Sequence, residues 1–215
     1  MDLNLINNQV VVIGGTKGIG LSISKGFLNE GAIVHIIARN ENKDLINELQ
    51  KKHNSKIFFY QSDATKIDSL KLACKKILQK TNNKLDVLIS NVGTGSVELD
   101  PLYSNKEWED SWNTNFTSAL NVARVFLNVI SQNKGSITFI SSIAGIEFVG
   151  APISYSTAKA ALNSFTKTLS QKLAPNVRVN SVAPGNIWIE NGTWDLKQKE
   201  NSEGVQKMLN EKVPL

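Results

Sequence analysis

Residues 9–20 read QVVVIGGTKGIG, a short β-branched run followed directly by a glycine-rich turn, and a segment of helical period comes next. The glycines at positions 14, 18 and 20 have the spacing G-x-x-x-G-x-G. Glycine suits such a turn because the backbone must bend sharply, approach a pyrophosphate without a Cβ in the way, and let the helix pack close to the strand. The N–H groups of the turn and the positive end of the helix dipole then face the anion. This stretch therefore predicts a strand, a turn and a helix that together bind phosphate.

The rest of the chain repeats the same alternation of short β-branched runs and longer segments of helical period. We expect strands near Gln9–Ile13, Ile33–Ala38, Lys56–Gln61, Val87–Ser90, Ser136–Ile140 and Arg178–Val182. We expect helices near Ile19–Asn29, Lys43–His53, Lys66–Gln79, Asn105–Ile130 with a break around Asn113–Asn115, Ser156–Leu173 and Glu203–Lys212. Because the strands are apolar almost throughout, helices should cover both faces of the sheet. The pattern predicts one α/β domain, residues 1–215, built on a parallel sheet flanked by helices.

Composition excludes several classes of protein. The chain has 215 residues, of which 41% are hydrophobic and 14 are glycine, a balance that fits a globular domain and excludes disorder and collagen-like repeats. Cys74 is the only cysteine, so no internal disulfide forms, and we predict no metal site. The net charge of +5 comes from short basic pairs within helical segments, so we predict no nucleic-acid partner. Because the sequence has neither a signal-like leader nor a long apolar run, we expect a cytoplasmic protein with no membrane partner.

The glycine turn resembles that of the short-chain dehydrogenase/reductase family, and the similarity runs from about Asn8 to Pro214. Ser90-Asn91-Val92-Gly93 is similar to the family's Asn-Asn-Ala-Gly element, and residues 182–189, VAPGNIWI, are similar to its Pro-Gly segment under the nicotinamide. The resemblance implies a Rossmann-like, doubly wound parallel sheet and a nicotinamide cofactor. It places that cofactor against Gly14, Thr16, Lys17, Gly18, Ile19, Gly20, Arg39, Asp63, Ala64, Asn91, Val92, Gly93, Tyr155, Lys159, Pro184, Gly185 and Ile187.

Asp63 and Arg39 bear on how the adenosine end of the cofactor would be held. Asp63 occupies the family position that hydrogen-bonds the adenine, but an Asp before a helix expected from Lys66 is also a helix cap, and the two roles are compatible. The second expected strand ends without a carboxylate that could accept the ribose 2′-hydroxyl. Arg39 stands there instead, and together with Lys17 it suits a 2′-phosphate. The sequence therefore favours NADP(H) over NAD(H) as the cofactor.

Four residues match the family's catalytic set: Asn115, Ser142, Tyr155 and Lys159. Tyr155 and Lys159 are four residues apart at the start of an expected helix, so they share one helix face. Ser142 precedes Tyr155 by thirteen residues, at the end of the fifth expected strand, which is the family's spacing. A carbonyl oxygen that gains charge during reduction needs a proton, so Tyr155 is expected to act as acid in reduction and as base in oxidation.

The other three members of the set would support Tyr155. The Lys159 ammonium favours the phenolate form of Tyr155, and the Ser142 hydroxyl would hold the substrate oxygen. By resemblance alone, Lys159 also holds the nicotinamide ribose and Asn115 positions a water in a proton relay. The resemblance thus implies an oxidoreductase that transfers a hydride between NADP(H) and a carbonyl compound or secondary alcohol.

The C-terminal part of the chain departs from the family pattern. Ile189 stands where the family usually has Thr, and relatives normally continue through another helix and a seventh strand. We expect either that the sequence is a fragment, the favoured reading, or that this strand is absent and one sheet edge is open. Residues 186–215 are expected to form a substrate lid and a C-terminal arm, with a polar, mobile loop over Trp188–Glu200.

Several alternatives stay open at this point. Acyl-carrier-protein thioesters, sugars and polyols, and small or steroid-like ketones are all possible small-molecule substrates, whereas a nucleotide-sugar epimerase is disfavoured by the glycine spacing and the chain length. A non-catalytic NADP(H)-binding sensor or scaffold is the alternative function, suggested by Ile189 and the short C-terminal part. The resemblance also implies a homodimer or homotetramer, assembled through the long helices after Asn115 and Tyr155.

Overall fold

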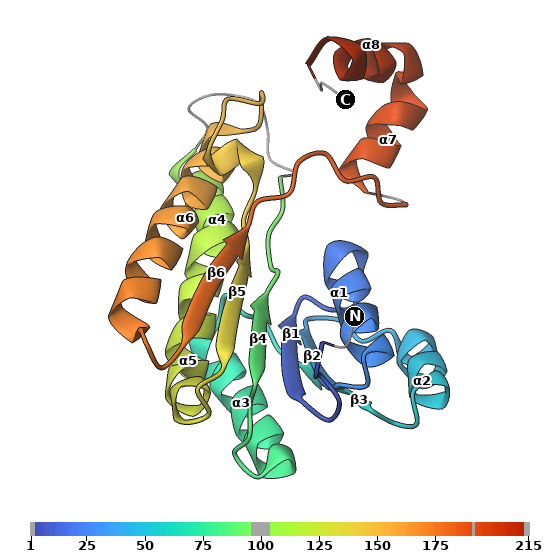
Figure 1. The fold of residues 1–215 in the computed structure, drawn as a ribbon. Helices are drawn as coiled ribbons and strands as arrows, with labels where there is room; N and C mark the ends of the chain where they lie inside the picture. Colours follow the sequence, from blue (N-terminus) through green and yellow to red (C-terminus); the bar gives the residue numbers. More distant parts are fainter. Residues whose placement is uncertain (1–2, 96–103, 191, 213–215) are drawn as a thin grey trace.

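Six short runs of β-branched and aromatic residues form one sheet in the computed structural model, which describes residues 3–95, 104–190 and 192–212 (Figure 1). All strand pairs are parallel, and the order is β3-β2-β1-β4-β5-β6. The strands are β1 (Gln9–Ile13), β2 (Ile33–Ala38), β3 (Ile57–Gln61), β4 (Val87–Ser90), β5 (Ser136–Ile140) and β6 (Arg178–Val182). The six predicted strands are confirmed, with β3 beginning one residue later than expected. The strand order reverses between β1 and β4, and in sheets of this kind ligands bind in a crevice at the carboxyl edge beside such a reversal.

The helices also follow the prediction, with two informative differences. They are α1 (Gly18–Asn29), α2 (Lys43–Lys52), α3 (Ile67–Thr81), α4 (Asn105–Trp112), α5 (Ser118–Gln132), α6 (Ile153–Leu173), α7 (Thr193–Glu200) and α8 (Ser202–Lys212). The break expected within the fourth helix is a π-helical turn, η1 (Asn113–Thr117), between α4 and α5. The start of α6 lies three residues before the expected Ser156, because Pro152 lacks an N–H and begins a helix without losing a hydrogen bond. Tyr155 therefore lies within the first turn of α6.

The prediction of a polar loop over Trp188–Glu200 is wrong for the second half of this segment, which forms the helix α7. Asp195 lies in the first turn of α7, and its carboxylate pairs with the Lys199 ammonium one turn later at 2.7 Å. An acidic residue in the first turn and an ion pair of this spacing both favour a helix. The polar composition of this segment thus reflects a solvated helix, which Figure 1 shows with α8 beyond the carboxyl ends of the strands.

Helices cover the sheet from both sides, as expected for a doubly wound fold. Alternate residues of β1 point to opposite faces, so Val11 and Ile13 pack with α3, α5 and α6, while Val10 and Val12 pack with α1 and α2. Both sets of side chains are buried. In the part of the chain that the structure describes, no helix is long and apolar enough to cross a membrane.

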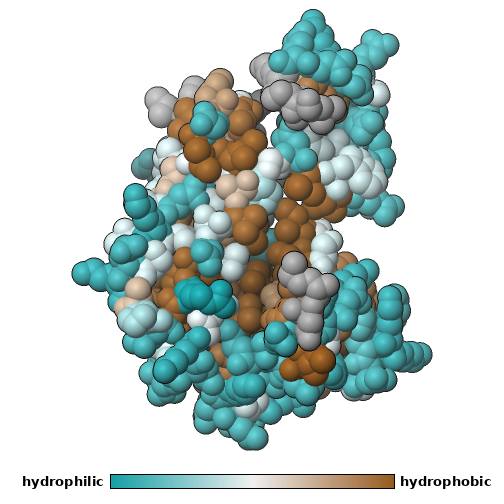
Figure 2. Space-filling model, viewed as in Figure 1, coloured by the Kyte–Doolittle hydropathy of each residue, from teal (hydrophilic) through white to brown (hydrophobic). Residues whose placement is uncertain are grey.

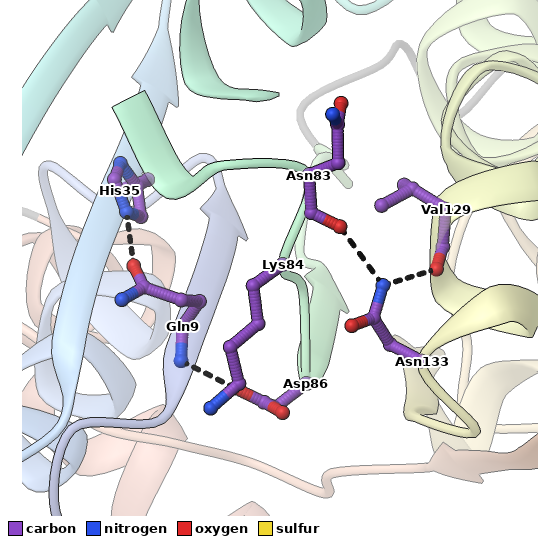
Figure 3. A network of polar contacts seen from close by, with 7 residues as sticks. All are labelled: Gln9, His35, Asn83, Lys84, Asp86, Val129 and Asn133. Atoms are coloured by element: carbon purple, nitrogen blue, oxygen red, sulfur yellow. Dashed lines mark hydrogen bonds and ion pairs between the residues drawn. The ribbon is translucent and has the colours of Figure 1, made fainter. Parts of the chain in front are cut away.

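A polar network ties the strands together at the amino edge of the sheet, opposite the crevice (Figure 3). His35 on β2 is buried, with Nε2 2.9 Å from Gln9 Oε1 and Nδ1 3.2 Å from the Tyr60 hydroxyl. The Gln9 N–H donates to the Asp86 carboxylate at 2.7 Å, and Lys84 lies 3.5 Å from the same carboxylate. Because an amide oxygen only accepts hydrogen bonds, the contact with Gln9 fits a proton on Nε2. Burial of the ring favours its neutral form. His35 therefore has a structural role.

We predict that His35 makes the fold sensitive to mild acid. Burial, with a smaller contribution from the Lys80 charge, lowers the pKa of His35 from 6.5 to about 4. Between these two pH values the unfolded chain binds a proton that the folded chain excludes, so the free energy of unfolding falls as the pH decreases, by up to about 3 kcal/mol. Urea unfolding at pH 4 to 7 measures this loss.

The matched comparison is His35→Gln against His53→Gln, which changes the histidine at the end of α2. The His35→Gln chain should be less stable at pH 7 but should lose less stability on acidification, whereas His53→Gln should keep the slope of the unmodified chain. An unchanged slope in His35→Gln would show that other groups cause the acid sensitivity.

Candidate active site

The glycine turn between β1 and α1 allows two stretches of backbone to approach closely. Gly14 has a φ of +77°, which favours glycine, and a Cβ on Gly20 would overlap the carbonyl oxygen of Gly14. The residue before α1 is Lys17, whose side chain gives no capping hydrogen bond to the first turn. The positive end of the α1 dipole is therefore not capped by a side chain from Lys17, as an anion-binding turn requires.

Two residues of this turn were missed by the sequence analysis. The Ser24 hydroxyl is buried in α1 and donates to the Gly20 carbonyl at 2.9 Å. A Cβ on Gly15 would lie 2.8 Å from the same hydroxyl, so a larger residue at position 15 would require Ser24 to shift. The available signal was a serine four residues after Gly20, within reach of its carbonyl on a helix.

The predicted cofactor residues other than Tyr155 and Lys159 all lie along the carboxyl edge of the sheet. Asn91 bridges the two strands at which the order reverses: its N–H donates to the Ile13 carbonyl at 3.1 Å, and its Nδ2 donates to the Gly14 carbonyl at 3.3 Å. The structure thus places Gly14, Thr16, Lys17, Gly18, Ile19 and Gly20 after β1, Arg39 after β2, Asp63 and Ala64 after β3, Asn91, Val92 and Gly93 after β4, and Pro184, Gly185 and Ile187 after β6.

Charged side chains gather at the end of this edge formed by β2 and β3. Lys17 and Arg39 are both exposed. Burial works to raise the pKa of Asp63, but hydrogen bonds from the Thr65 N–H and hydroxyl, with the charges of Arg39 and Lys66, hold it below its ordinary value. Asp63 therefore caps the turn that precedes α3, while the N-cap position of α3 itself is Lys66. The charge of Arg39 affects the pKa of Asp63, so this part of the edge carries both a cation and an anion.

Lys159 on α6 is the most unusual group at the site. It is 3% exposed, and its Nζ donates to the Ile140 carbonyl at 2.9 Å. The ring centroid of Tyr155 lies 5.8 Å from the same nitrogen. Burial lowers the pKa of Lys159 to about 8, because an ammonium loses hydration there. The ammonium is therefore close to Tyr155 in surroundings that screen its charge poorly.

Asn115 in η1 fastens the loop after β4. It is fully buried; its Oδ1 accepts from the Thr94 N–H at 2.9 Å, and its Nδ2 donates to the carbonyls of Thr94 and Ser111. A Cβ on Gly93 would lie 3.0 Å from both Asn115 Oδ1 and Lys159 Nζ, so a larger residue there would crowd these two groups. The π-helical turn thus aims Asn115 at the loop, a use of such turns that is common at functional sites.

Ser142 begins the short 3₁₀ turn η2 (Ile143–Gly145), which packs on α6. A Cβ on Gly145 would lie 2.6 Å from the carbonyl carbon of Lys159, so the turn and the helix are in close contact. The Ser141 hydroxyl donates to the Lys159 carbonyl at 3.3 Å, while the Ser142 hydroxyl accepts from the Ala144 N–H. Among the described residues, no hydrogen bond joins Ser142 to Tyr155, so the two hydroxyls share the edge without contacting each other. Gly145 is a positioning glycine that the sequence analysis did not single out.

Comparisons with known proteins agree with this geometry. The family model described as short chain dehydrogenase matches residues 8–200, which is most of the chain. The chain belongs to the short-chain dehydrogenase/reductase family. A 3-oxoacyl-acyl-carrier-protein reductase FabG from Chlamydia muridarum is 35% identical over 191 residues, covering 87% of this chain and 77% of the relative. Another from Aquifex aeolicus is 31% identical over 219 residues, covering all of this chain and 86% of the relative.

Solved structures support the same short-chain dehydrogenase/reductase assignment. The Cj0485 dehydrogenase superposes with a TM-score of 0.84 at 30% identity and covers 94% of this chain and 80% of its own. L-Sorbose reductase from Gluconobacter frateurii, crystallised with NADPH and L-sorbose, superposes with a TM-score of 0.86 at 26% identity and covers 97% of this chain and 81% of its own. The chain is therefore an oxidoreductase of a family that binds nicotinamide cofactors and acts on small molecules.

Within this family fold, the segment after β6 packs onto two parts of the site. The Ile143 N–H donates to the Pro184 carbonyl at 3.1 Å, which ties the segment to η2. Further along, Ile189 Cδ1 lies 3.2 Å from the place where a Cβ on Gly18 would be. The isoleucine that replaces the family's usual Thr therefore lies against the first turn of α1, where it offers a methyl group in place of a hydroxyl.

We predict that Lys159 reduces the stability of the fold. Lowering its pKa from 10.5 to about 8 corresponds to about 3 kcal/mol against the charged form. In Lys159→Met this cost disappears, while loss of the hydrogen bond to Ile140 offsets about 1 kcal/mol. The variant should therefore be more stable than the unmodified chain by about 2 kcal/mol at pH 7, as measured by urea unfolding.

The pH dependence separates this cause from better packing. Below pH 8 Lys159 is charged in the folded and unfolded chains, so the full difference is present. Between pH 8 and 10.5 the folded chain releases the proton first, so the unmodified chain gains stability and the difference narrows. Lys167→Met, on the exposed side of α6, should change stability little at any pH, and an equal gain in that variant would contradict the prediction.

Proposed function

We propose that this chain is an NADP(H)-dependent oxidoreductase that interconverts a carbonyl compound and its secondary alcohol, with Tyr155 as the general acid and base. The observation that carries the proposal is the buried Lys159 ammonium, 5.8 Å from the Tyr155 ring at the carboxyl edge of the sheet. A buried charge is costly and is retained where it does chemical work. Most structural lysines are exposed, so its position beside a tyrosine favours a catalytic role.

The cofactor fits the features of the turn and the edge. The glycine turn has room for a pyrophosphate against an α1 N-terminus that has no side-chain cap, and Gly93 keeps the loop after β4 close to Lys159. The phosphates would lie on the turn, the adenosine end toward Arg39 and Asp63, and the nicotinamide end toward Lys159 and the segment after Pro184. When bound, the nicotinamide supplies or accepts the hydride.

The chain's own residues would manage the proton. When a carbonyl carbon is reduced, its oxygen gains negative charge, and the Tyr155 hydroxyl donates a proton to it. The Lys159 ammonium stabilises the phenolate that Tyr155 then becomes, because opposite charges attract strongly in a poorly solvated site. Ser142 would donate a hydrogen bond to the substrate oxygen and hold it near Tyr155. In oxidation the same proton moves in the opposite direction.

The hydrogen bonds of the Asn115 side chain indicate how this residue would contribute to the reaction. Its amide is engaged by the backbone of Thr94 and Ser111, so it acts on the reaction by holding the loop after β4. Because the side-chain amide is occupied, a water in a proton relay would bind to the backbone carbonyl of Asn115. Assembly into a homodimer or homotetramer, a cytoplasmic location, and closure of residues 186–215 over the substrate stay predictions.

Tyr155→Phe should reduce turnover by about 10²–10⁴-fold, because it removes only the proton donor. NADPH affinity and the free energy of unfolding should change little. Turnover over a panel of carbonyl compounds, followed by NADPH absorbance, measures the loss, and calorimetry measures the affinity. Tyr60→Phe, which removes a β3 hydroxyl that contacts His35 and is not part of the proposed catalytic set, is the matched control and should keep full turnover.

The same assay distinguishes the alternative function. Full turnover in Tyr155→Phe would overturn the proposed mechanism. Tight NADPH binding with no turnover of any carbonyl by the unmodified chain would support the sensor or scaffold, for which the placement of Ile189 against the phosphate turn is the specific observation.

NADPH should bind at least about tenfold more tightly than NADH, which is about 1.4 kcal/mol, because Lys17 and Arg39 can contact a 2′-phosphate with charge assistance. Arg39→Asp should abolish or reverse this preference. Lys51→Asp, which makes the same charge change on the exposed surface of α2, should leave it intact. Calorimetry with both cofactors is the measurement, and equal affinities in the unmodified chain would contradict the cofactor assignment.

A further inference from the structure

Large apolar side chains are exposed mainly around the candidate active site. Eleven such side chains are exposed among the described residues, and six of them lie in segments 146–153 and 187–188. These six are Ile146, Phe148, Val149, Ile153, Ile187 and Trp188, which we call the apolar rim. Scattered exposed apolar residues are ordinary, but a cluster of them marks a binding surface. Phe148, at 98% exposed, is the extreme case.

The rim is continuous with the site. Ile146 directly follows η2, the turn that Ser142 begins, and Ile153 lies two residues before Tyr155 at the start of α6. Ile187 and Trp188 follow the Pro-Gly segment, which the Ile143 N–H and the Pro184 carbonyl tie to η2. Both segments therefore follow the carboxyl ends of the paired strands β5 and β6, and the first segment lies between Ser142 and Tyr155 in sequence. Figure 2 shows a hydrophobic patch on the projecting segment between β5 and α6.

The charged residues within or directly beside the two rim segments in sequence are acidic. Glu147 lies within the first segment and Glu190 directly follows the second, and neither segment contains a lysine or an arginine. The lysines of α7 are engaged within that helix, because Lys199 pairs with Asp195 at 2.7 Å and Lys197 lies 5.0 Å from the Trp194 ring centroid. A carboxylate or phosphate on the substrate would thus meet repulsion at the rim, whereas a hydrocarbon chain would be stabilised there.

We propose that the apolar rim binds the hydrocarbon part of an uncharged substrate, so that the preferred substrates are apolar ketones and their secondary alcohols. This inference rests on the proposed carbonyl reduction and specifies its substrate class. Sugars and polyols would leave the rim in contact with water and gain nothing from it. Substrates that carry a phosphate or carboxylate near the carbonyl would face Glu147 and Glu190.

The test is kcat/KM with saturating NADPH for a series of straight-chain methyl ketones and for oxo acids of matched length. In the ketone series kcat/KM should rise about two- to fourfold for each added methylene, mainly through a lower KM, as expected for burial of hydrocarbon. Each oxo acid should be about tenfold or more slower than its matched ketone. Phe148→Ser should flatten the ketone series, because the loss of kcat/KM should grow with the length of the hydrocarbon chain.

Leu72→Ser is the control, because Leu72 is another exposed large apolar residue and lies on α3, away from the rim. It should keep the chain-length dependence. A flat series in the unmodified chain, or faster turnover of the oxo acids, overturns this inference while the reductase function stands. Turnover of no member of either series overturns the proposed function and the inference with it. If Phe148→Ser leaves the kinetics unchanged but alters the mass measured by light scattering, the rim is a subunit contact and the inference is wrong.

Discussion

The buried ammonium of Lys159 is the constraint on which the carboxyl edge depends. A charge at 3% exposure is tolerated only where hydrogen bonds replace water, and the Ile140 carbonyl takes one of its protons at 2.9 Å. The loop after β4 reaches it through Gly93, and η2 reaches its backbone through Gly145. Three separate parts of the chain thus meet at one nitrogen and its backbone, and their relative positions define the site.

Hydrogen bonds between buried polar groups of α4, η1, α6 and the loop after β4 hold the surroundings of Lys159 in place. Asn115 binds both polar groups of the Thr94 backbone, and the buried Ser154 hydroxyl donates to the Ser111 hydroxyl at 2.8 Å. These contacts join α4 to α6 and α4 to the loop after β4. Each would be costly if left unsatisfied in the interior, so the arrangement resists small displacements of Tyr155 and Lys159. Positioning therefore comes from satisfied buried groups, at a cost in stability that Lys159 shows most clearly.

The candidate active site and the His35 network lie at opposite edges of the same sheet. All strands are parallel, so their carboxyl ends meet at one edge, where the glycine turn, Arg39, Asp63, Asn91 and Pro184 come together. The amino edge carries the neutral His35 network instead. The first edge retains an uncapped helix start and an exposed apolar rim, whereas at the second edge His35 has partners within the chain for both ring nitrogens.

Local signals alone were sufficient for the strand-turn-helix unit of residues 9–20, the six strands, the break before Asn115 and the spacing of Ser142, Tyr155 and Lys159. These depend on periodicity, glycine geometry and neighbours within a few residues, so the sequence by itself determined them. Only the tertiary structure showed that Gly145 leaves space for the close approach of α6 and that Ile189 lies against Gly18. Only the tertiary structure showed that burial lowers the pKa of Lys159 and that the apolar rim borders the site. Each of these features depends on burial or on contact between segments distant in sequence. Burial and such contacts are set by the packing of the whole chain, so a local sequence pattern does not reveal them.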